Sequence, residues 1–210
     1  MLHHFVTTPQ EVLMVVSRSL AAVATAGLLA AGTVMALAAP AAAASRFDDG
    51  SFEYPTAPAN AFTTVSAGQP IGPWKVTGGA VDLIGTGFWQ AAEGGQSVDL
   101  NATQAGAVAQ TFTTTAGKRY TVTYSLAANP EGGPAVKTGR VLVDGQNFQD
   151  FSFDSTGKTR ASMGYVTRQV TFVANGPTTT LGFASTVTGA YGPVVDDVRV
   201  ESCCGCGDGC

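Results

Sequence analysis

The stretch Tyr120 to Leu126, YTVTYSL, decides the fold class, because its apolar and aromatic residues alternate strictly with Thr and Ser. This period of two is typical of a β-strand that buries one face and exposes the other. No other run in the chain alternates so cleanly. The stretch therefore predicts a strand whose Tyr, Val and Leu side chains face a core.

Similar short runs recur on both sides of this strand. Thr, Val, Phe and Gly are abundant, turn residues separate the runs, and helical signals are nearly absent. Strands are predicted over 46–54, 74–77, 80–84, 96–100, 107–113, 120–126, 140–143, 148–153, 165–174, 179–185 and 194–200, with a long loop over 55–73. About ten strands without helices predict an all-β sandwich or barrel.

The N-terminal region reads as a targeting segment. Arg18 precedes an almost uncharged apolar run over 20–39, and small residues follow as far as Ala44. This order of basic, apolar and small residues is typical of a secretory signal peptide, although a membrane anchor of similar length is the alternative. We expect a signal peptide over 1–44, with translation starting at Met1 or Met14, and a secreted or cell-surface protein.

The composition after this segment excludes several functions. Glu11 and Arg18 cancel, so the remaining chain keeps the net charge of −4, which gives no attraction for nucleic acid. Both histidines, His3 and His4, lie in the targeting segment. Histidine-dependent catalysis and histidine-ligated zinc are therefore excluded, and no transmembrane segment is expected in the mature chain.

The stretch Trp89 to Asn101, WQAAEGGQSVDLN, is the first candidate for ligand binding. Its second half alternates as a half-buried strand, and its first half reads as a loop at the mouth of the β-structure. Trp89 with Gln90 could stack on a sugar face and bind its hydroxyl groups, or Trp89 could belong to the core. Tyr191, between glycines, is a second loop aromatic. In contrast, Trp74 and Gln110 are predicted to be buried.

Several segments in their order along the chain resemble the bacterial choice-of-anchor C proteins, which are similar to plant cell-wall proteins built on a domain of unknown function. The segments are DGSFEYP (49–55), GPWKVTGGAVDLIG (72–85), WQAAEGGQSVDLN (89–101), GAVAQTF (106–112), YTVTYSLAANPEGGPAVK (120–137) and GPVVDDVRV (192–200). The resemblance implies a jelly-roll β-sandwich of the galactose-binding-domain-like type over 45–201. It also implies a secreted, carbohydrate-associated protein without a catalytic residue set to carry over.

The C-terminal tail, 202–210, departs from that family, whose members commonly end in a sorting signal. It holds all the cysteines of the chain, Cys203, Cys204, Cys206 and Cys210, interleaved with Gly. Their spacing is poor for a disulfide framework and lacks the paired spacing of zinc sites. The alternatives are a covalent handle for surface attachment and a tail without a role, and we favour the handle.

Acidic residues raise two further hypotheses. A glycosidase needs two facing carboxylates, and Glu53, Glu93, Asp99 and Glu131 could supply them, but no spacing selects a pair. A non-catalytic module that binds cell-wall or extracellular polysaccharide is therefore favoured. A structural or adhesive envelope protein comes second, and a polysaccharide hydrolase or lyase third.

The second hypothesis concerns a metal. If the first and last strands approach each other, their carboxylates crowd together, and proton uptake, ion pairs or a hard cation must relieve the repulsion. The resemblance implies a structural calcium between an N-terminal Phe-Glu and a C-terminal Asp-Asp, matched here by Phe52-Glu53 and Asp196-Asp197. Asp48, Glu53 and Asp196 are the expected ligands, with Asp196 the least solvated.

Overall fold

The computed structural model describes residues 47–202, and these form two six-stranded antiparallel sheets that pack face to face. One sheet has the order β1-β4-β5-β12-β7-β10 and the other β2-β3-β6-β11-β8-β9. The strands are β1 Phe62–Ser66, β2 Pro70–Ile71, β3 Trp74–Gly78, β4 Ala80–Ile84, β5 Ser97–Asp99, β6 Ala107–Thr113, β7 Arg119–Ala128, β8 Val136–Val143, β9 Gln146–Asp154, β10 Val166–Val173, β11 Thr178–Ser185 and β12 Pro193–Ser202.

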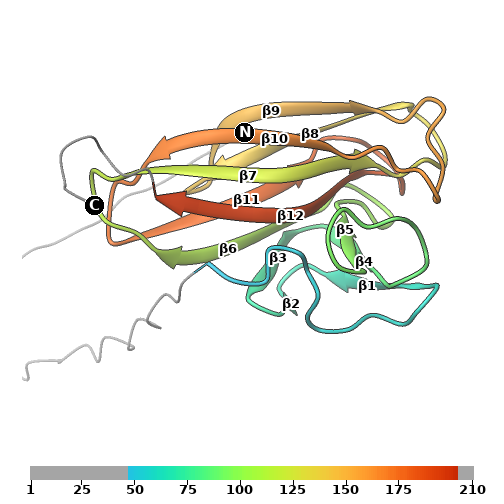
Figure 1. Cartoon of the computed structure of the whole chain (residues 1–210), viewed down its shortest axis with the longest axis horizontal. Helices are drawn as coiled ribbons and strands as arrows, with labels where there is room; N and C mark the ends of the chain where they lie inside the picture. Colours follow the sequence, from blue (N-terminus) through green and yellow to red (C-terminus); the bar gives the residue numbers. More distant parts are fainter. Residues whose placement is uncertain (1–46, 203–210) are drawn as a thin grey trace, which may run out of the picture. The chain divides into compact units, whose positions relative to one another are not determined.

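From β5 onward the chain passes repeatedly from one sheet to the other, as in a jelly roll. Long strands run lengthwise through both layers, and the loops that follow β4, β7, β9 and β11 gather at one end of the sandwich (Figure 1). The predicted all-β jelly-roll sandwich is confirmed.

The core lies between the sheets, where period-two alternation sends one face of each strand inward. On β7, Val122, Tyr124 and Leu126 are buried, as the alternation predicted. Trp74 is also buried and its indole N–H donates to the Asp49 carbonyl at 2.9 Å. Gln110 is buried with both ends of its amide bonded to the Asp48 backbone. The predicted burial of Trp74 and Gln110 is confirmed.

The predicted strand over 46–54 is wrong. The backbone takes positive φ angles at Asp49 (47°) and Phe52 (57°), which an extended strand does not allow. This segment instead folds as a loop that places Phe52 in the core, 4.9 Å from the Trp74 ring centroid. Conversely, the predicted loop over 55–73 contains β1 and β2.

The N-terminal loop does lie against the last strand, as expected. The Val198 amide donates to the Gly50 carbonyl at 2.8 Å. A Cβ on Gly50 would collide with the Val198 carbonyl, so the close approach needs glycine. The two ends of the domain are therefore joined by backbone contact.

Strand β5 was predicted to be half-buried, and this is wrong. Ser97, Val98 and Asp99 are all buried, although their side chains alternate between the two faces of the sheet. Loops cover the outer face at this point, so both faces are shielded from water.

Within residues 47–202 the chain contains no helix, and hence none that could cross a membrane. The predicted signal peptide over 1–44 and the four cysteines of the tail lie outside the described residues.

Candidate binding site under the loops

The site begins with the outer face of three neighbouring strands. Strand register places Thr64 of β1 opposite Asp82 of β4, and Asp82 opposite Asp99 of β5. The next row outward contains Phe62, Ile84 and Ser97. Because directly opposed residues share a face, these two rows form one surface with polar and apolar halves.

Loops turn this surface into a pocket of about 350 Å³. Its walls come from the segments after β4, β5, β7, β9 and β11, which meet at the same end of the sandwich (Figure 1). The lining residues are Phe62, Thr64, Asp82, Ile84, Phe88, Trp89, Asp99, Ala102, Thr103, Asn129, Glu131, Arg160, Ala190 and Tyr191. We call this cavity the loop pocket.

Aromatic rings form one wall of the loop pocket. Phe62 is 47% exposed and meets Phe88 edge-on, with 5.5 Å between ring centroids. Phe88 in turn meets Trp89 at 5.4 Å and lies 4.1 Å beneath the Arg160 guanidinium. Tyr191, 38% exposed, adds a further ring to the lining. Aromatic faces that remain open to solvent are the surfaces on which sugar rings stack.

Two carboxyl groups lie side by side on the pocket floor. Asp99 is buried, and its oxygens accept hydrogen bonds from the Asn129 side chain (2.8 Å) and from the Asn101 (2.9 Å) and Gly192 (3.1 Å) amides. Burial, together with the charge of nearby Asp82, raises the pKa of Asp99 to about 7 despite these bonds. Burial also raises the pKa of Asp82, against the effect of a hydrogen bond from Thr64.

The loop after β11 is fixed from below by Asn101. Its side-chain nitrogen donates to the Val187 carbonyl at 2.9 Å and to the Gly189 carbonyl at 2.6 Å. Gly192 passes so close that a Cβ there would lie 2.5 Å from an Asp99 oxygen. Only glycine fits between this loop and β5, and the fit holds Tyr191 at the pocket rim.

The loop after β7 packs against the same tyrosine. Gly132 has a φ of 59° and no room for a Cβ, because the Tyr191 ring occupies that place. The Lys137 amine donates to the Gly132 carbonyl at 3.0 Å and lies 5.8 Å from the centre of the Tyr191 ring. Burial lowers the pKa of Lys137, opposed by the charge of Asp99. Loop and ring thus hold each other in position.

An ion pair between the loop after β9 and the loop after β7 forms another wall of the loop pocket. Arg160 donates from Nε to the Glu131 carboxylate at 2.7 Å, and its second nitrogen lies at the same distance from that oxygen. Gln90 holds the loop that carries Arg160. Its backbone N–H donates to the Arg160 carbonyl (2.8 Å), and its side-chain oxygen accepts a hydrogen bond from the Met163 backbone N–H (3.0 Å). The guanidinium is thereby held over Phe88.

The predicted roles of Trp89 and Gln90 need correction. Trp89 is only 6% exposed and its indole N–H donates to Ser97 Oγ at 2.9 Å, so it is a buried support of the pocket floor. Gln90 lines an adjoining hollow next to Phe88, and its side-chain oxygen already accepts a hydrogen bond from the Met163 backbone N–H. Of the two alternatives for Trp89, the exposed indole is wrong, because β5 and the loops close over it; ligand binding by Trp89 and Gln90 stays a prediction. Tyr191, by contrast, does line the pocket.

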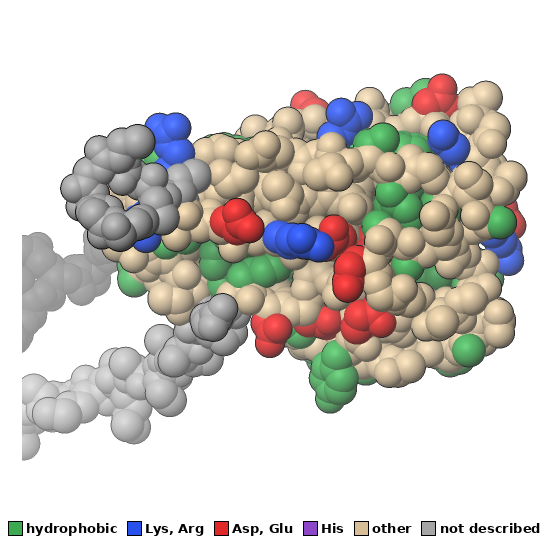
Figure 2. All heavy atoms as spheres, in the orientation of Figure 1, with side chains coloured by type: hydrophobic (Ala, Val, Ile, Leu, Met, Phe, Trp, Pro, Cys, Tyr) green, Lys and Arg blue, Asp and Glu red, His purple; other side chains and the backbone are tan. Residues whose placement is uncertain are grey.

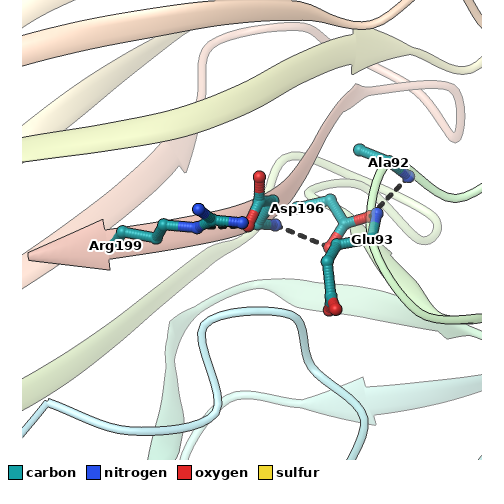
Figure 3. Close-up of polar contacts among 5 residues, drawn as sticks. Ala92, Glu93, Asp196 and Arg199 are labelled. Carbon is teal, nitrogen blue, oxygen red and sulfur yellow. Dashed lines mark hydrogen bonds and ion pairs between the residues drawn. The ribbon is translucent and has the colours of Figure 1, made fainter.

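The Trp89 loop is anchored by two carboxylates that were predicted as calcium ligands. Asp196 is buried and accepts hydrogen bonds from the amides of Ala92 (2.7 Å) and Glu93 (3.1 Å), as Figure 3 shows. Glu53 accepts from the amides of Gly95 (2.9 Å) and Gln96 (2.8 Å). Burial raises the pKa of Asp196 to about 7.

The expected ligands do not form one cluster. Asp48 caps the next residue's amide at 2.9 Å, while Glu53 and Asp196 each hold a different part of the loop. In the described part of the chain, no three His, Cys, Asp or Glu side chains are grouped so that they could hold a metal ion. Acidic side chains do gather over this face, around a basic side chain (Figure 2), and Arg199 pairs with Asp197 at 2.8 Å. Calcium binding itself stays a prediction.

Phe62, Asp82, Asn129 and Arg160 are among the lining residues that sequence reasoning missed. Phe62 begins a short run of aromatic and β-branched residues, FTTVS, inside a segment dominated by turn residues, and the run does not alternate. Asp82 interrupts the apolar run AVDLI, and a charge at the centre of an apolar strand was the available signal. Asn129 and Arg160 lie in loops, where no local pattern indicates which residues meet.

Comparison with known families gives one match that covers most of the chain. The model of a family described as "Protein of unknown function (DUF642)" matches residues 45–201. No match was found among curated proteins.

Comparison with solved structures gives similarities at low sequence identity. A family 35 carbohydrate binding module from Clostridium thermocellum has a TM-score of 0.46 and 16% identity, and covers 67% of this chain and 99% of its own. A family 35 module of Abf62 from Cellvibrio japonicus has a TM-score of 0.46 and 22% identity, covering 66% and 93%. TmCBM61, solved with β-1,4-galactotriose, has a TM-score of 0.45 and 16% identity, covering 62% and 88%.

Proposed function

The chain belongs to the DUF642 family of proteins of unknown function, and on this premise we propose that it is a non-catalytic module that binds polysaccharide in the loop pocket. The observation that carries the proposal is the lining of that pocket. Exposed faces of Phe62 and Tyr191 flank a floor of carboxyl, amide and hydroxyl groups. Sugars require this combination, because their C–H faces stack on rings while their hydroxyl groups exchange hydrogen bonds.

The charge of the pocket favours uncharged sugar hydroxyls. Asp82, Asp99 and Glu131 line it, while the cation of the lining, Arg160, is already paired with Glu131. An anionic group placed there would face carboxylates without a free cation among the described lining residues. Hydroxyl groups, which can donate to Asp82 and accept from the guanidinium, fit better.

The alternative of a glycosidase is favoured by one observation, the adjacent Asp82 and Asp99 with raised pKa values. A general acid in such an enzyme does need a raised pKa. However, both oxygens of Asp99 already accept hydrogen bonds from neighbouring residues, and the side chain is buried. Asp99 therefore acts in shaping the pocket, and binding without bond cleavage is the better proposal.

Affinity electrophoresis of the domain through gels containing galactan, xylan or β-glucan tests this function. We expect retardation by at least one neutral polysaccharide, and no new reducing ends after incubation with it. Phe62→Ala or Tyr191→Ala should weaken the retardation about tenfold, equivalent to roughly 1.4 kcal/mol of lost stacking.

Phe148 offers a matched control, because it is also 47% exposed but lies on β9, outside the loop pocket. Phe148→Ala should leave retardation unchanged. Equal loss in Phe62→Ala and Phe148→Ala would show that the pocket is not the binding surface. Release of reducing ends would replace the proposal with the glycosidase.

We further propose that the protein is a secreted, surface-attached choice-of-anchor C protein. The family name rests on the segments over 49–200 that resemble those proteins, secretion on the signal-like segment over 1–44, and attachment on the thiols of the tail. Deletion of 202–210 should release the protein into the medium with its fold unchanged. Equal surface retention of both forms would contradict attachment through the tail.

Structural calcium near Glu53 and Asp196 is proposed on the family resemblance, and thermal melts in chelator and in millimolar calcium would test it.

A further inference from the structure

A second cavity lies at the open edge of the sandwich, away from the loop pocket. It has a volume of about 190 Å³ and lies between β7 and β10 of one sheet and β9 of the other. Its lining residues are Tyr124, Gln149, Asp150, Phe151, Ser152 and Arg168. It shares no residue with the loop pocket. We call it the edge cleft.

The floor of the edge cleft is a tyrosine whose hydroxyl group lacks a partner. Tyr124 is only 1% exposed, with its ring packed against Phe183 and Phe151 at centroid distances of 5.0 and 6.1 Å. Within residues 47–202, its hydroxyl forms no hydrogen bond. A buried hydroxyl group normally finds a partner, because leaving it unpaired costs the desolvation of the group. The hydroxyl is therefore an unused donor, buried in the floor of the cleft.

A guanidinium stands beside this hydroxyl. Arg168 is directly opposite Tyr124 in the pairing of β10 with β7, so both side chains extend from the same face of the sheet. Arg168 also lowers the pKa of the Tyr124 hydroxyl, although burial raises that pKa to about 12 overall. Among the described residues the arginines in ion pairs are Arg140, Arg160 and Arg199, so the Arg168 charge is uncompensated.

The other charged residue of the cleft, Asp150, has a basic partner of its own. Asp150 pairs with Arg140 at 3.3 Å and also accepts from the Asn147 side chain at 3.1 Å. Gln149 and Ser152 add neutral hydrogen-bonding groups to the walls. Two donors with one free positive charge, in a cleft with polar walls, match a group that has two acceptor oxygens and one negative charge.

We propose that the edge cleft is a second saccharide site, which binds the carboxylate of an acidic sugar through the Tyr124 hydroxyl and the Arg168 guanidinium. The site is independent of the proposed function of the loop pocket. A chain with both sites binds neutral sugars at one end of the sandwich and an acidic sugar at its open edge.

Titration calorimetry with sodium glucuronate, at constant ionic strength and with glucose as the uncharged analogue, tests the proposal. We expect saturable binding of glucuronate and none of glucose. Arg168→Gln should weaken binding about tenfold or more, because it removes a charge-assisted hydrogen bond. Tyr124→Phe should weaken it severalfold while the melting temperature holds or rises, since no native hydrogen bond is lost.

Two control variants separate this site from general charge effects and from the loop pocket. Arg119→Gln removes the same charge from β7 outside the cleft, and Asp82→Asn alters the loop pocket, so both should leave glucuronate binding unchanged. Absence of binding by the wild type, equal binding of glucose, or retained affinity in Arg168→Gln would overturn the proposal. Loss in Asp82→Asn equal to that in Arg168→Gln would also overturn it, by moving glucuronate to the loop pocket.

Discussion

The loop pocket and the edge cleft are both lined by aromatic and charged residues, yet they use their polar atoms differently. In the loop pocket, Asp99, Trp89 and Arg160 all have hydrogen-bond partners within the protein. In the edge cleft, the Tyr124 hydroxyl and the Arg168 charge have none within 47–202. The first cavity is built by loops that stabilise one another, whereas the second lies between the edge strands of the two sheets.

This difference separates residues that shape a site from residues that contact a ligand. A buried group with all its partners in place stabilises the fold, and its removal costs free energy of unfolding. An exposed ring or an unpartnered donor contributes little to the fold and is available to a ligand. The following predictions, ordered by expected size, test this distinction.

Trp89→Ala should have the largest effect, because it empties a buried site beneath the loop pocket. The expected loss is about 3–5 kcal/mol of unfolding free energy, measured by urea denaturation. Phe62→Ala, only two ring contacts away, should cost about 1 kcal/mol, since its side chain is 47% exposed and its ring contact is with Phe88. Similar losses in the two variants would contradict the division between support and ligand contact.

Asp99 should make stability depend on pH. Its pKa is raised to about 7 in the folded protein, above the value of about 3.9 expected when unfolded. Between these values the folded state holds a proton that the unfolded state has released, so stability falls as pH rises, by up to about 1.4 kcal/mol per pH unit. Asp99→Asn should reduce this slope in denaturation at pH 5, 6 and 7.

The control for this effect is Asp154→Asn, on the exposed end of β9, where bonds from Thr156 lower the pKa. It should leave the slope between pH 5 and 7 unaltered. An unchanged slope in Asp99→Asn would show that the floor carboxyl is ionised in the folded protein throughout this range. Part of the fall in stability with pH should persist in Asp99→Asn, because the pKa of Asp196 is also raised to about 7.

The two cavities should act independently on a polysaccharide that carries both neutral and acidic sugars, such as glucuronoxylan. Phe62→Ala and Arg168→Gln should each weaken retardation, and in the double variant the two free-energy losses should add within about 0.5 kcal/mol. The cavities share no lining residue, which is the reason for additivity. A double variant no weaker than either single one would show a single binding surface.

Tyr124→Phe should have the smallest effect on stability, and its sign is informative. Because the hydroxyl has no partner in the described structure, its removal should leave unfolding free energy unchanged or raise it by up to about 1 kcal/mol. Calorimetric melting of both forms measures the change. A loss above about 1 kcal/mol would mean that the hydroxyl is hydrogen-bonded in solution.

Local sequence patterns determined the strands and therefore the fold class. Alternation along β4, β6, β7 and β11 gave their positions to within a few residues, because a strand that buries one face repeats every two residues. The segment before β1 failed, because Asp49 and Phe52 take positive φ angles that an alternating pattern does not reveal. The burial of Trp74 and Gln110 was also readable, since each lies in or beside a strand with a clear inner face.

Burial at the loops, in contrast, was decided by the tertiary structure. The sequence left Trp89 between an exposed loop position and the core, and Ser97 with the adjoining loops encloses it. Asp82 and Asp99 become a pair only when β4 and β5 align, and Arg160 joins them from a distant part of the chain. Sequence alone fixes the residues that can stack, donate or carry charge. Which of them keep that capacity depends on contacts between distant segments, because those contacts determine which groups lose water and which find partners.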